Sequence, residues 1–403
     1  MRLLTSKSTA AAIVLGATLA TTLPARAAQE ASHPEPKAPV VAPDTDGEAV
    51  DFDVVYKADV MRINVKNGEN KTVSLGNVDA RVTVDGERAF NLPGSTFFLY
   101  LLNNHGGKPN ENAGTAQGLD NIEVSTATTK IYQAWYQQNF SEDRVSILFG
   151  LYDLNSEFYV TDASAIFINP SFGIGPDFSQ SGANGPSIFP TTSLGVRFKY
   201  QFTPDLEWIL TALDGVPGDP NNARGTHVKL DSDDGWLVAT EVDANVGKGK
   251  VGLGYWRYTK KVSDLTDALI QHSNNGFYFL AEQQLTQAEA EPEQGLKAFL
   301  RYGIANADVN AIERALEIGV SYQGLIPGRG DDVVGLGYAQ ANYSSKSQDP
   351  SSPDYESIVE LSYRAKVAEW LVVQPDLQYV TDHGGATSMR TTLLGVRVEL
   401  SWQ

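Results

Sequence analysis

The feature that most constrains this chain is an alternation of apolar and polar residues with a period of two, which recurs from about residue 50 to the end. In the final segment, apolar residues take every second place, at Leu394, Val396, Val398, Leu400 and Trp402. Successive side chains of a β-strand point to opposite faces, so this segment predicts a strand with one apolar and one polar face. Similar patterns run over 194–202 and 371–379, and long amphipathic helical patterns are absent.

Clusters of Gly, Asn, Asp and Pro separate sixteen such segments, which we predict as strands. An even number of strands suits an antiparallel barrel that crosses a membrane with both termini on one side, and strand lengths near 9 to 11 residues suit the tilted crossing. The predicted fold class is therefore all-β, a 16-stranded antiparallel transmembrane barrel with short periplasmic turns and long extracellular loops. The predicted strands are 50–63, 72–84, 94–103, 130–140, 144–153, 191–202, 206–214, 235–246, 250–260, 275–285, 295–304, 314–324, 332–343, 355–365, 370–380 and 391–402.

The predicted connections differ in length at the two ends of the barrel. If the amino terminus is periplasmic, the longest connection on the extracellular side, which we call outward, covers 154–190. The turns on the periplasmic side are as short as 141–143 and 247–249. Outer-membrane barrels segregate their connections in this way, and a soluble sandwich has no reason to do so. The connection at 154–190 is long enough to fold inward and narrow a pore, although a surface loop over the mouth fits equally well. Its candidate contributors are Glu157, Phe158, Asp162, Asp177 and Phe178.

The first 28 residues have the pattern of a secretory signal peptide. A positive start is followed by an apolar stretch over 10–20 and by a small-x-small cleavage site at Ala25-Arg26-Ala27. A membrane anchor is disfavoured because the apolar stretch is shorter than the roughly 20 residues needed to span. Residues 29–49 contain four prolines among charged residues, which predicts a disordered periplasmic arm. The barrel domain is expected over 50–403.

Composition excludes several functional classes. The 403-residue chain has no cysteine, which excludes disulfides, a lipoprotein anchor and thiolate chemistry. Its formal net charge of -18 argues against nucleic-acid binding. Gly-x-Ser-x-Gly, His-Glu-x-x-His and P-loop motifs are absent. We predict no catalytic residue, metal or cofactor, and we place all five histidines, at 33, 105, 227, 272 and 383, in the arm or in outward connections.

Charged residues on the inner face of the predicted strands indicate a water-filled lumen, because isolated charges are costly to bury in a dry core. For each of them the alternative is a salt bridge that holds the wall. These residues are Arg197, Arg301, Glu360, Asp376 and Arg397. Four of the six tryptophans, Trp208, Trp236, Trp370 and Trp402, lie near predicted strand ends, as in an interfacial aromatic girdle, although β propensity is an alternative explanation.

Several stretches resemble the carbohydrate-selective porins of the OprB type. The most specific is the tail from Glu356 to Trp402, which contains Gln374–Val380 and Gly395–Arg397. Two positions depart from the family pattern: Asp382-His383 precedes two glycines where a proline is expected, and Gln403 follows the terminal aromatic residue. These departures leave the transported solute open. The other matching stretches are Gly150–Asn155 with Phe158, Ser193–Arg197, Asn275–Phe277 with Glu282–Gln283, and Ile326–Arg329 with Asp332 and Gly335.

The resemblance implies a sixteen-stranded channel in the outer membrane of a Gram-negative bacterium that passes small sugars passively, with polar and arginine side chains at a constriction. Mixed inward charges favour a neutral polyhydroxylated solute over phosphate. The expected partners are carbohydrates and outer-membrane lipid, without nucleic acid, and both a monomer and a homotrimer stay open. The candidate pore-lining and substrate-binding residues are Asp153, Asn155, Glu157, Arg197, Glu282, Arg301, Gln374, Asp376, Gln378 and Arg397.

Two alternatives from other classes remain. An outer-membrane barrel enzyme would need a nucleophile, a base and an orienting group near the rim, and the absence of a histidine from every predicted strand weakens it. A secreted soluble carbohydrate-binding β protein would share the composition and the compartment. It would lack the apolar outer stripe, and its connections would not be long at one end and short at the other.

Overall fold

The computed structural model describes residues 48–66, 68–288, 291–347, 352–382 and 389–402. All of them belong to one compact unit, Pro34–Gln403. The predicted signal peptide, most of the predicted arm, His33 and His383 lie outside the described residues. No helix among the described residues is long and apolar enough to cross a membrane.

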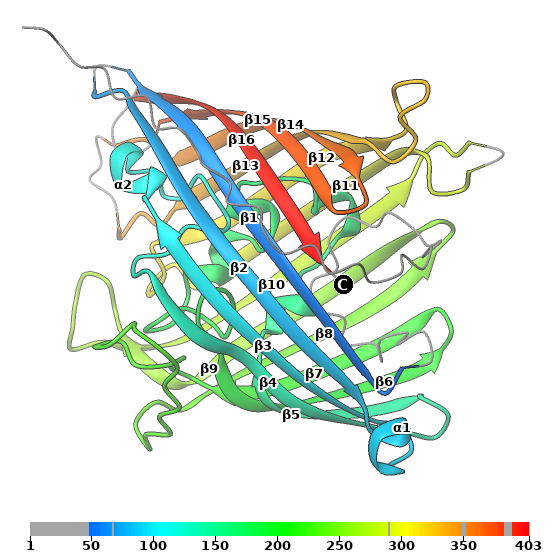
Figure 1. The fold of residues 1–403 in the computed structure, drawn as a ribbon. Coiled ribbons are helices and arrows are strands. Elements are labelled where there is room, and N and C mark those ends of the chain that lie inside the picture. The colour runs from blue at the N-terminus through cyan, green and yellow to red at the C-terminus, as the bar shows by residue number, and fades with distance from the viewer. Residues whose placement is uncertain (1–47, 67, 289–290, 348–351, 383–388, 403) are drawn as a thin grey trace, which may run out of the picture. The chain divides into compact units, whose positions relative to one another are not determined.

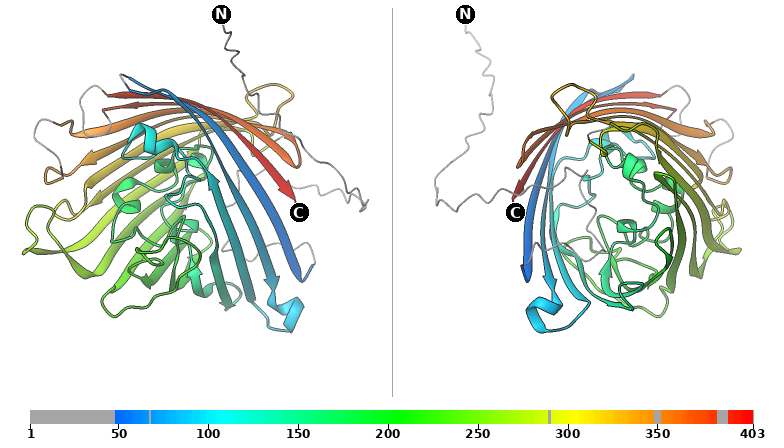
Figure 2. Two further views of the ribbon diagram at one scale, coloured as in Figure 1. Left: turned by 60° about the vertical axis from the view of Figure 1, so that its left-hand side comes forward. Right: turned by 90° about the vertical axis from the view of Figure 1, so that its right-hand side faces the viewer.

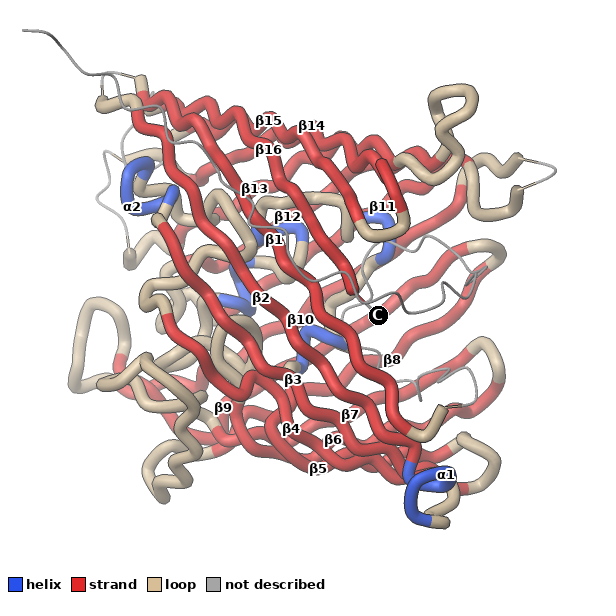
Figure 3. The backbone as a smooth tube through the Cα atoms, in the orientation of Figure 1, coloured by secondary structure: helices blue, strands red, loops and turns tan. Residues whose placement is uncertain are grey.

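The unit is a closed barrel of sixteen antiparallel strands (Figure 1). Every strand pairs with its neighbours in sequence, and β1 pairs with β16 to close the barrel. Helical pieces are short and lie in the connections (Figure 3), such as α1 (Gly86–Phe90), α2 (Pro109–Ala113) and α3 (Pro176–Ser179). The strands are β1 (Val50–Val65), β2 (Lys71–Asp85), β3 (Ser95–Gly106), β4 (Thr128–Phe140), β5 (Val145–Tyr152), β6 (Ser193–Thr203), β7 (Leu206–Asp214), β8 (Trp236–Val246), β9 (Gly249–Ser263), β10 (Gln271–Gln284), β11 (Gly295–Ala305), β12 (Ile312–Gln323), β13 (Val333–Tyr343), β14 (Tyr355–Ala368), β15 (Leu371–Thr381) and β16 (Arg390–Trp402).

All sixteen predicted strands are confirmed, and the largest boundary difference is at the start of β10. A register shift between Ser273 and Asn275 interrupts the pairing of β10 with β9, which hides the alternation there. The prediction that all histidines lie in connections is therefore wrong for His272, which is in β10, and also for His105, which is in β3 because that strand runs to Gly106. His227 lies in a connection, as predicted.

The inside-outside assignment of the strands is confirmed. In β16, Leu394 and Val396 are 58% and 42% exposed on the outer face, whereas Arg397 is buried inside. Trp236, Trp370 and Trp402 are exposed at strand ends, as a girdle predicts, and Trp208 is partly exposed. The remaining two tryptophans, Trp135 and Trp256, are buried inside.

The two ends of the barrel differ as predicted. One end, which we call the loop end, carries the long connections 107–127, 153–192 and 215–235. The other end carries turns such as 204–205 and 247–248, and we call it the turn end. The first residue of β1 and the last residue of β16 also lie there. Figure 2 shows, in its right-hand view, chain between β5 and β6 lying within the ring of strands.

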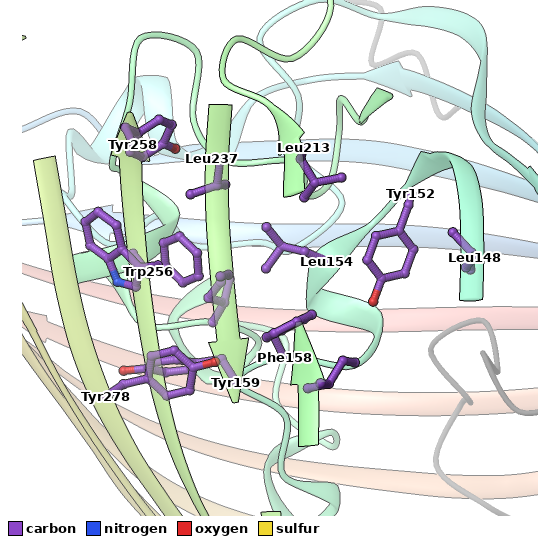
Figure 4. Close-up of a cluster of buried hydrophobic side chains, with 14 of the residues drawn as sticks. Leu148, Tyr152, Leu154, Phe158, Tyr159, Leu213, Leu237, Trp256, Tyr258 and Tyr278 are labelled. Carbon is purple, nitrogen blue, oxygen red and sulfur yellow. The ribbon is translucent and has the colours of Figure 1, made fainter. Parts of the chain in front are cut away.

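The connection 153–192, which we call the inward segment, packs inside the barrel. Its Phe178 ring lies parallel to the Trp256 ring with 4.8 Å between centroids, and the surrounding apolar side chains form one cluster (Figure 4). A second cluster packs Phe167 and Phe172 against β11 and β13, and a Cβ on Gly337 would lie 2.7 Å from the Phe172 ring. Of the two alternatives that the sequence left open for this connection, the structure shows the inward fold.

Candidate functional site

The inner face of β8–β15 binds the backbone of the inward segment through charged and amide side chains. Glu360 accepts hydrogen bonds from the backbone N–H groups of Ile168 (2.6 Å) and Asn169 (3.0 Å). Glu241 accepts one from Tyr159 N (2.9 Å), and Glu282 accepts one from Ala163 N (3.0 Å). These carboxylates replace the strand partners that an irregular buried segment lacks.

Donors on the same wall satisfy the carbonyl groups of the segment. Arg301 donates to the carbonyls of Tyr159 (3.2 Å), Gly173 (3.1 Å) and Ser171 (2.8 Å). Gln374 donates to the Ile166 carbonyl at 2.6 Å. We call these wall side chains, Glu241, Glu282, Arg301, Glu360, Gln374 and Gln378, the tethering wall.

A second inward connection, 107–127, is held where the tethering wall meets the closing strands. Gln378 donates to the Leu119 carbonyl (2.9 Å) and to Asp376 Oδ1 (3.0 Å). Arg397 binds Asp59 of β1 through two nitrogens, at 2.9 and 2.7 Å, and also donates to the side chain of Asn121 at 2.8 Å. Arg397 therefore links β16, β1 and this connection by charge-assisted hydrogen bonds.

The start of the inward segment is held by the opposite wall. Arg197 of β6 donates to Glu157 (2.9 Å), Ser146 Oγ (2.7 Å) and Gln137 (2.6 Å). Burial acts to raise the pKa of Glu157, but the nearby charges of Arg197 and Lys199 hold this pKa below its usual value. The Glu157 carboxylate is therefore ionised at neutral pH.

Asp153 and Asn155 fix the first turn of the inward segment. Asp153 accepts hydrogen bonds from Asn155 N (2.8 Å) and from the Tyr132 hydroxyl (2.6 Å). The Asn155 side chain donates to the carbonyls of Phe158 (3.0 Å) and Gly173 (3.2 Å). All ten sequence-predicted site residues thus face the interior, and each binds other parts of the protein. Arg197, Arg301 and Arg397 form salt bridges, which is the alternative that the sequence left open for them.

Sequence reasoning missed a second set of inward charges, on β1–β3. Arg81 pairs with Asp53 (2.7 Å), and Lys57 pairs with Asp79 (3.4 Å), which also accepts a hydrogen bond from the Tyr100 hydroxyl (2.6 Å). The Arg81 guanidinium lies 5.9 Å from the centre of the Tyr100 ring. We call these five residues the paired strip. The alternation of Asp79 and Arg81 with apolar residues in β2 is the sequence signal that could have revealed it.

Solvent reaches the interior through a cavity at each end. A cavity of about 300 Å³ near the turn end is lined by Glu157, Lys199 and Glu207, with Lys199 lying 3.3 Å from Glu157 and 3.0 Å from Glu207. A cavity of about 320 Å³ lies at the loop end, between residues 124–126, 184–192 and 218–227, and we call it the mouth cavity. Glu157 is the sequence-predicted residue that lines the turn-end cavity.

One group of possible metal ligands occurs among the described residues. Ligand atoms of Asp264, His272 and Asp308 lie within 4.8 Å of one another at the loop end. Lys346 contacts Asp264 and lies 2.6 Å from Asp308, and its hydrogen bond holds the pKa of Asp264 below the usual value. A lysine ammonium thus already neutralises these carboxylates.

Comparisons with known proteins agree with this architecture. The model of the family described as carbohydrate-selective porin, OprB family, matches residues 69–402. Porin B of Pseudomonas aeruginosa is 24% identical over 341 residues, which cover 74% of this chain and 73% of that protein. The high-pH structure of Pseudomonas putida OprB superposes with a TM-score of 0.78 at 20% identity, over 88% of this chain and 94% of that one. The structure of the outer-membrane channel DcaP of Acinetobacter baumannii superposes with a TM-score of 0.54 at 11% identity, over 88% of this chain and 97% of that one.

Proposed function

Since the chain belongs to the carbohydrate-selective porin family OprB, and so forms a sugar-diffusion channel in the outer membrane, we propose that its solutes pass between the inward segment and the paired strip. The observation that carries this proposal is the difference in partners around the lumen. Glu241, Arg301 and Glu360 of the tethering wall are bonded to backbone and buried, whereas Lys57, Arg81 and Asp53 of the strip keep side chains that are 14%, 13% and 21% exposed.

The paired strip suits a neutral polyhydroxylated solute. Paired cations and anions offer donors and acceptors that replace the water bound to sugar hydroxyls, without selecting ions of one sign. Tyr100 adds an aromatic face, and its ring lies 5.0 Å from that of Tyr132, which in turn lies 6.2 Å from the Phe189 ring at the mouth cavity. These rings form a row that leads from the mouth cavity toward the strip.

The sequence-predicted site residues divide between two roles in this proposal. Glu157 contacts the solute together with Lys199, because both line the turn-end cavity. The others are positioning residues that fix the width of the constriction by holding the inward connections. These are Asp153, Asn155, Arg197, Glu282, Arg301, Gln374, Asp376, Gln378 and Arg397.

The proposal also fixes the orientation of the barrel. We place the turn end in the periplasm, because β1 begins there and β16 ends there, and because the predicted signal peptide exports the chain. The outer face contacts lipid, in agreement with exposed apolar residues such as Leu253 (66%) and Leu394 (58%). Passive diffusion needs no catalytic residue or cofactor, so we propose that the protein is not an enzyme.

Flux through reconstituted protein tests the proposal. Proteoliposomes should swell in arabinose or glucose and swell more slowly in a tetrasaccharide of similar hydroxyl density. Replacing both cations of the strip, as Lys57→Met with Arg81→Met, should reduce the block of ion current by glucose. The matched control is Arg257→Met with Lys261→Met, which removes two exposed charges from β9. Equal swelling in all sugars, or an unchanged block in the strip variant, would contradict the proposal.

A further inference from the structure

The mouth cavity is bounded by parts of three connections and by the first residues of β4. Its volume of about 320 Å³ lies near the lower end of the range typical of small-molecule sites. Polar and aromatic groups both line it, among them Asn104, Lys130, Asn184, Phe189 and Thr191. Such a combination can bind the hydroxyl groups and the apolar face of a small polyol.

The cavity is held in shape by contacts between distant connections. Thr226, in the connection between β7 and β8, accepts a hydrogen bond from Ile131 N (2.6 Å) and donates to the Ile131 carbonyl (3.0 Å) of β4. Gly225 N donates to Thr128 Oγ1 at 2.9 Å, and the Asn184 side chain donates to the Pro217 carbonyl at 2.7 Å. The connection thus reaches past β6 and β5 to fix the rim, and preorganisation of this kind lowers the entropic cost of binding.

Lys130 gives the cavity an uncompensated positive charge. The residue is only 8% exposed, and its ammonium donates to Thr191 Oγ1 at 3.1 Å. Within the described part of the chain no carboxylate pairs with it, whereas Asp219, the acidic residue of the lining, forms a salt bridge with Lys229. A buried ammonium without an anionic partner is unfavourable and is relieved by a bound anion.

We propose that the mouth cavity is a binding site for sugar acids, in which the solute's carboxylate pairs with Lys130. The hydroxyl groups of the solute then bind Thr191 and neighbouring polar groups, and its carbon chain contacts Phe189. The inference rests on the proposed channel function and extends it from neutral sugars to aldonates and uronates. The site concentrates such solutes at the loop end, where the acidic chain as a whole would repel them.

Single-channel recordings with gluconate and sorbitol test the site, because the two solutes have the same carbon skeleton and differ in the carboxylate. The mature protein is inserted in planar bilayers, and each solute is added to one side at a time. Gluconate added at the loop end should block with an affinity on the order of tenfold higher than sorbitol. Lys130→Met should reduce gluconate to the level of sorbitol, whereas Lys130→Arg should keep most of the difference.

Control measurements separate a built site from general attraction of anions. Lys261→Met removes an exposed charge from β9, also at the loop end of the barrel, and should leave the gluconate block unchanged. Acetate, which has the carboxylate without the polyol, should block weakly. Heat-modifiable gel migration shows whether each variant has assembled, and Lys130→Arg supplies the comparison if Lys130→Met does not insert.

Distinct outcomes overturn the site and the channel function. Three results would overturn the sugar-acid site. The first is equal block by gluconate and sorbitol, and the second is a loss of gluconate block in Lys261→Met as large as that in Lys130→Met. The third is block by acetate or inorganic phosphate as strong as that by gluconate. Proteoliposome swelling in neutral sugars would persist in each of these cases. Loss of that swelling in the unmodified protein would instead overturn the channel function itself.

Discussion

On the tethering wall, charged side chains bond to the backbone of the inward segment, whereas on the paired strip they bond to side chains of neighbouring strands. Arg301 and Glu360 of the tethering wall are both fully buried, and together they bind five backbone groups of the segment. Arg81 and Asp53 of the paired strip keep part of their surface in the lumen. The same residue types therefore hold the inward segment in one region and, in the function that we propose, face the solute in the other.

Removing an arginine from each region should give the largest contrast. Arg301→Met leaves three backbone carbonyls without their donor and leaves Glu317, 3.6 Å away, without its ion pair. We expect a loss of about 3 to 5 kcal/mol in stability and a larger, noisier single-channel conductance. Arg81→Met should cost at most about 1 kcal/mol and should change the sugar block instead. Similar effects of the two substitutions on unfolding and on conductance would show that the two regions have the same role.

The pH dependence should have opposite signs at Asp177 and at Glu157 of the inward segment. Burial raises the pKa of Asp177 to about 7, so the folded state binds more protons than the unfolded state and stability falls as the pH rises from about 4 to about 7. The slope is at most about 1.4 kcal/mol per pH unit. The pKa of Glu157 is lowered in the folded protein, so its contribution is present above pH 4.5 and is lost as the pH falls below it.

Amide exchange resolves these two contributions along the chain. Protection of residues 176–179 should decrease between pH 4 and 7 after correction for intrinsic rates, and Asp177→Asn should remove that change. Protection around Glu157 should decrease in acid. A common pH dependence at both places would show that the segment opens as one unit.

A smaller effect is expected from Glu360→Gln. The amide keeps one acceptor oxygen for the two N–H groups of Ile168 and Asn169, so one of these groups loses its partner. We expect a cost of about 1 to 3 kcal/mol, seen as faster exchange of these two amides. Glu207→Gln in the turn-end cavity is the matched control, since Glu207 remains 26% exposed and water can replace its partner. Unchanged exchange in Glu360→Gln would mean that the tether is dispensable.

The smallest effect is expected on the paired strip. Tyr100→Phe removes the hydroxyl that binds Asp79 and keeps the ring. We expect a loss of about 0.5 to 1.5 kcal/mol in sugar binding, measured as a few-fold weaker block of the ion current by glucose. Tyr302→Phe, on the outer face and 42% exposed, should leave the block unchanged. A stronger effect of the outer substitution would place the solute pathway elsewhere.

The strands and their facing could be predicted because the period of two is a local property of the sequence. Leu394 and Val396 lie outside and Arg397 lies inside because successive side chains of a strand point to opposite faces, and this pattern is visible in a few neighbouring residues. The partners of the inward residues could not be predicted in the same way. Glu360 binds the backbone of Ile168, which is 192 residues away in the chain, and this contact depends on the path of an irregular connection. Sequence therefore identified inward polar residues without separating positioning residues from those that face the lumen.

Thiol accessibility distinguishes a solute path along the paired strip from one along the tethering wall, because the chain contains no cysteine and every label reports one position. Lys57→Cys on the paired strip and Ser362→Cys on β14, a fully buried position beside Gln374, are labelled with a membrane-impermeant reagent in reconstituted protein. We expect rapid labelling of Lys57→Cys that glucose slows, and little labelling of Ser362→Cys with or without sugar. Rapid labelling of Ser362→Cys that glucose slows, with Lys57→Cys unprotected, would instead place the solute along the tethering wall.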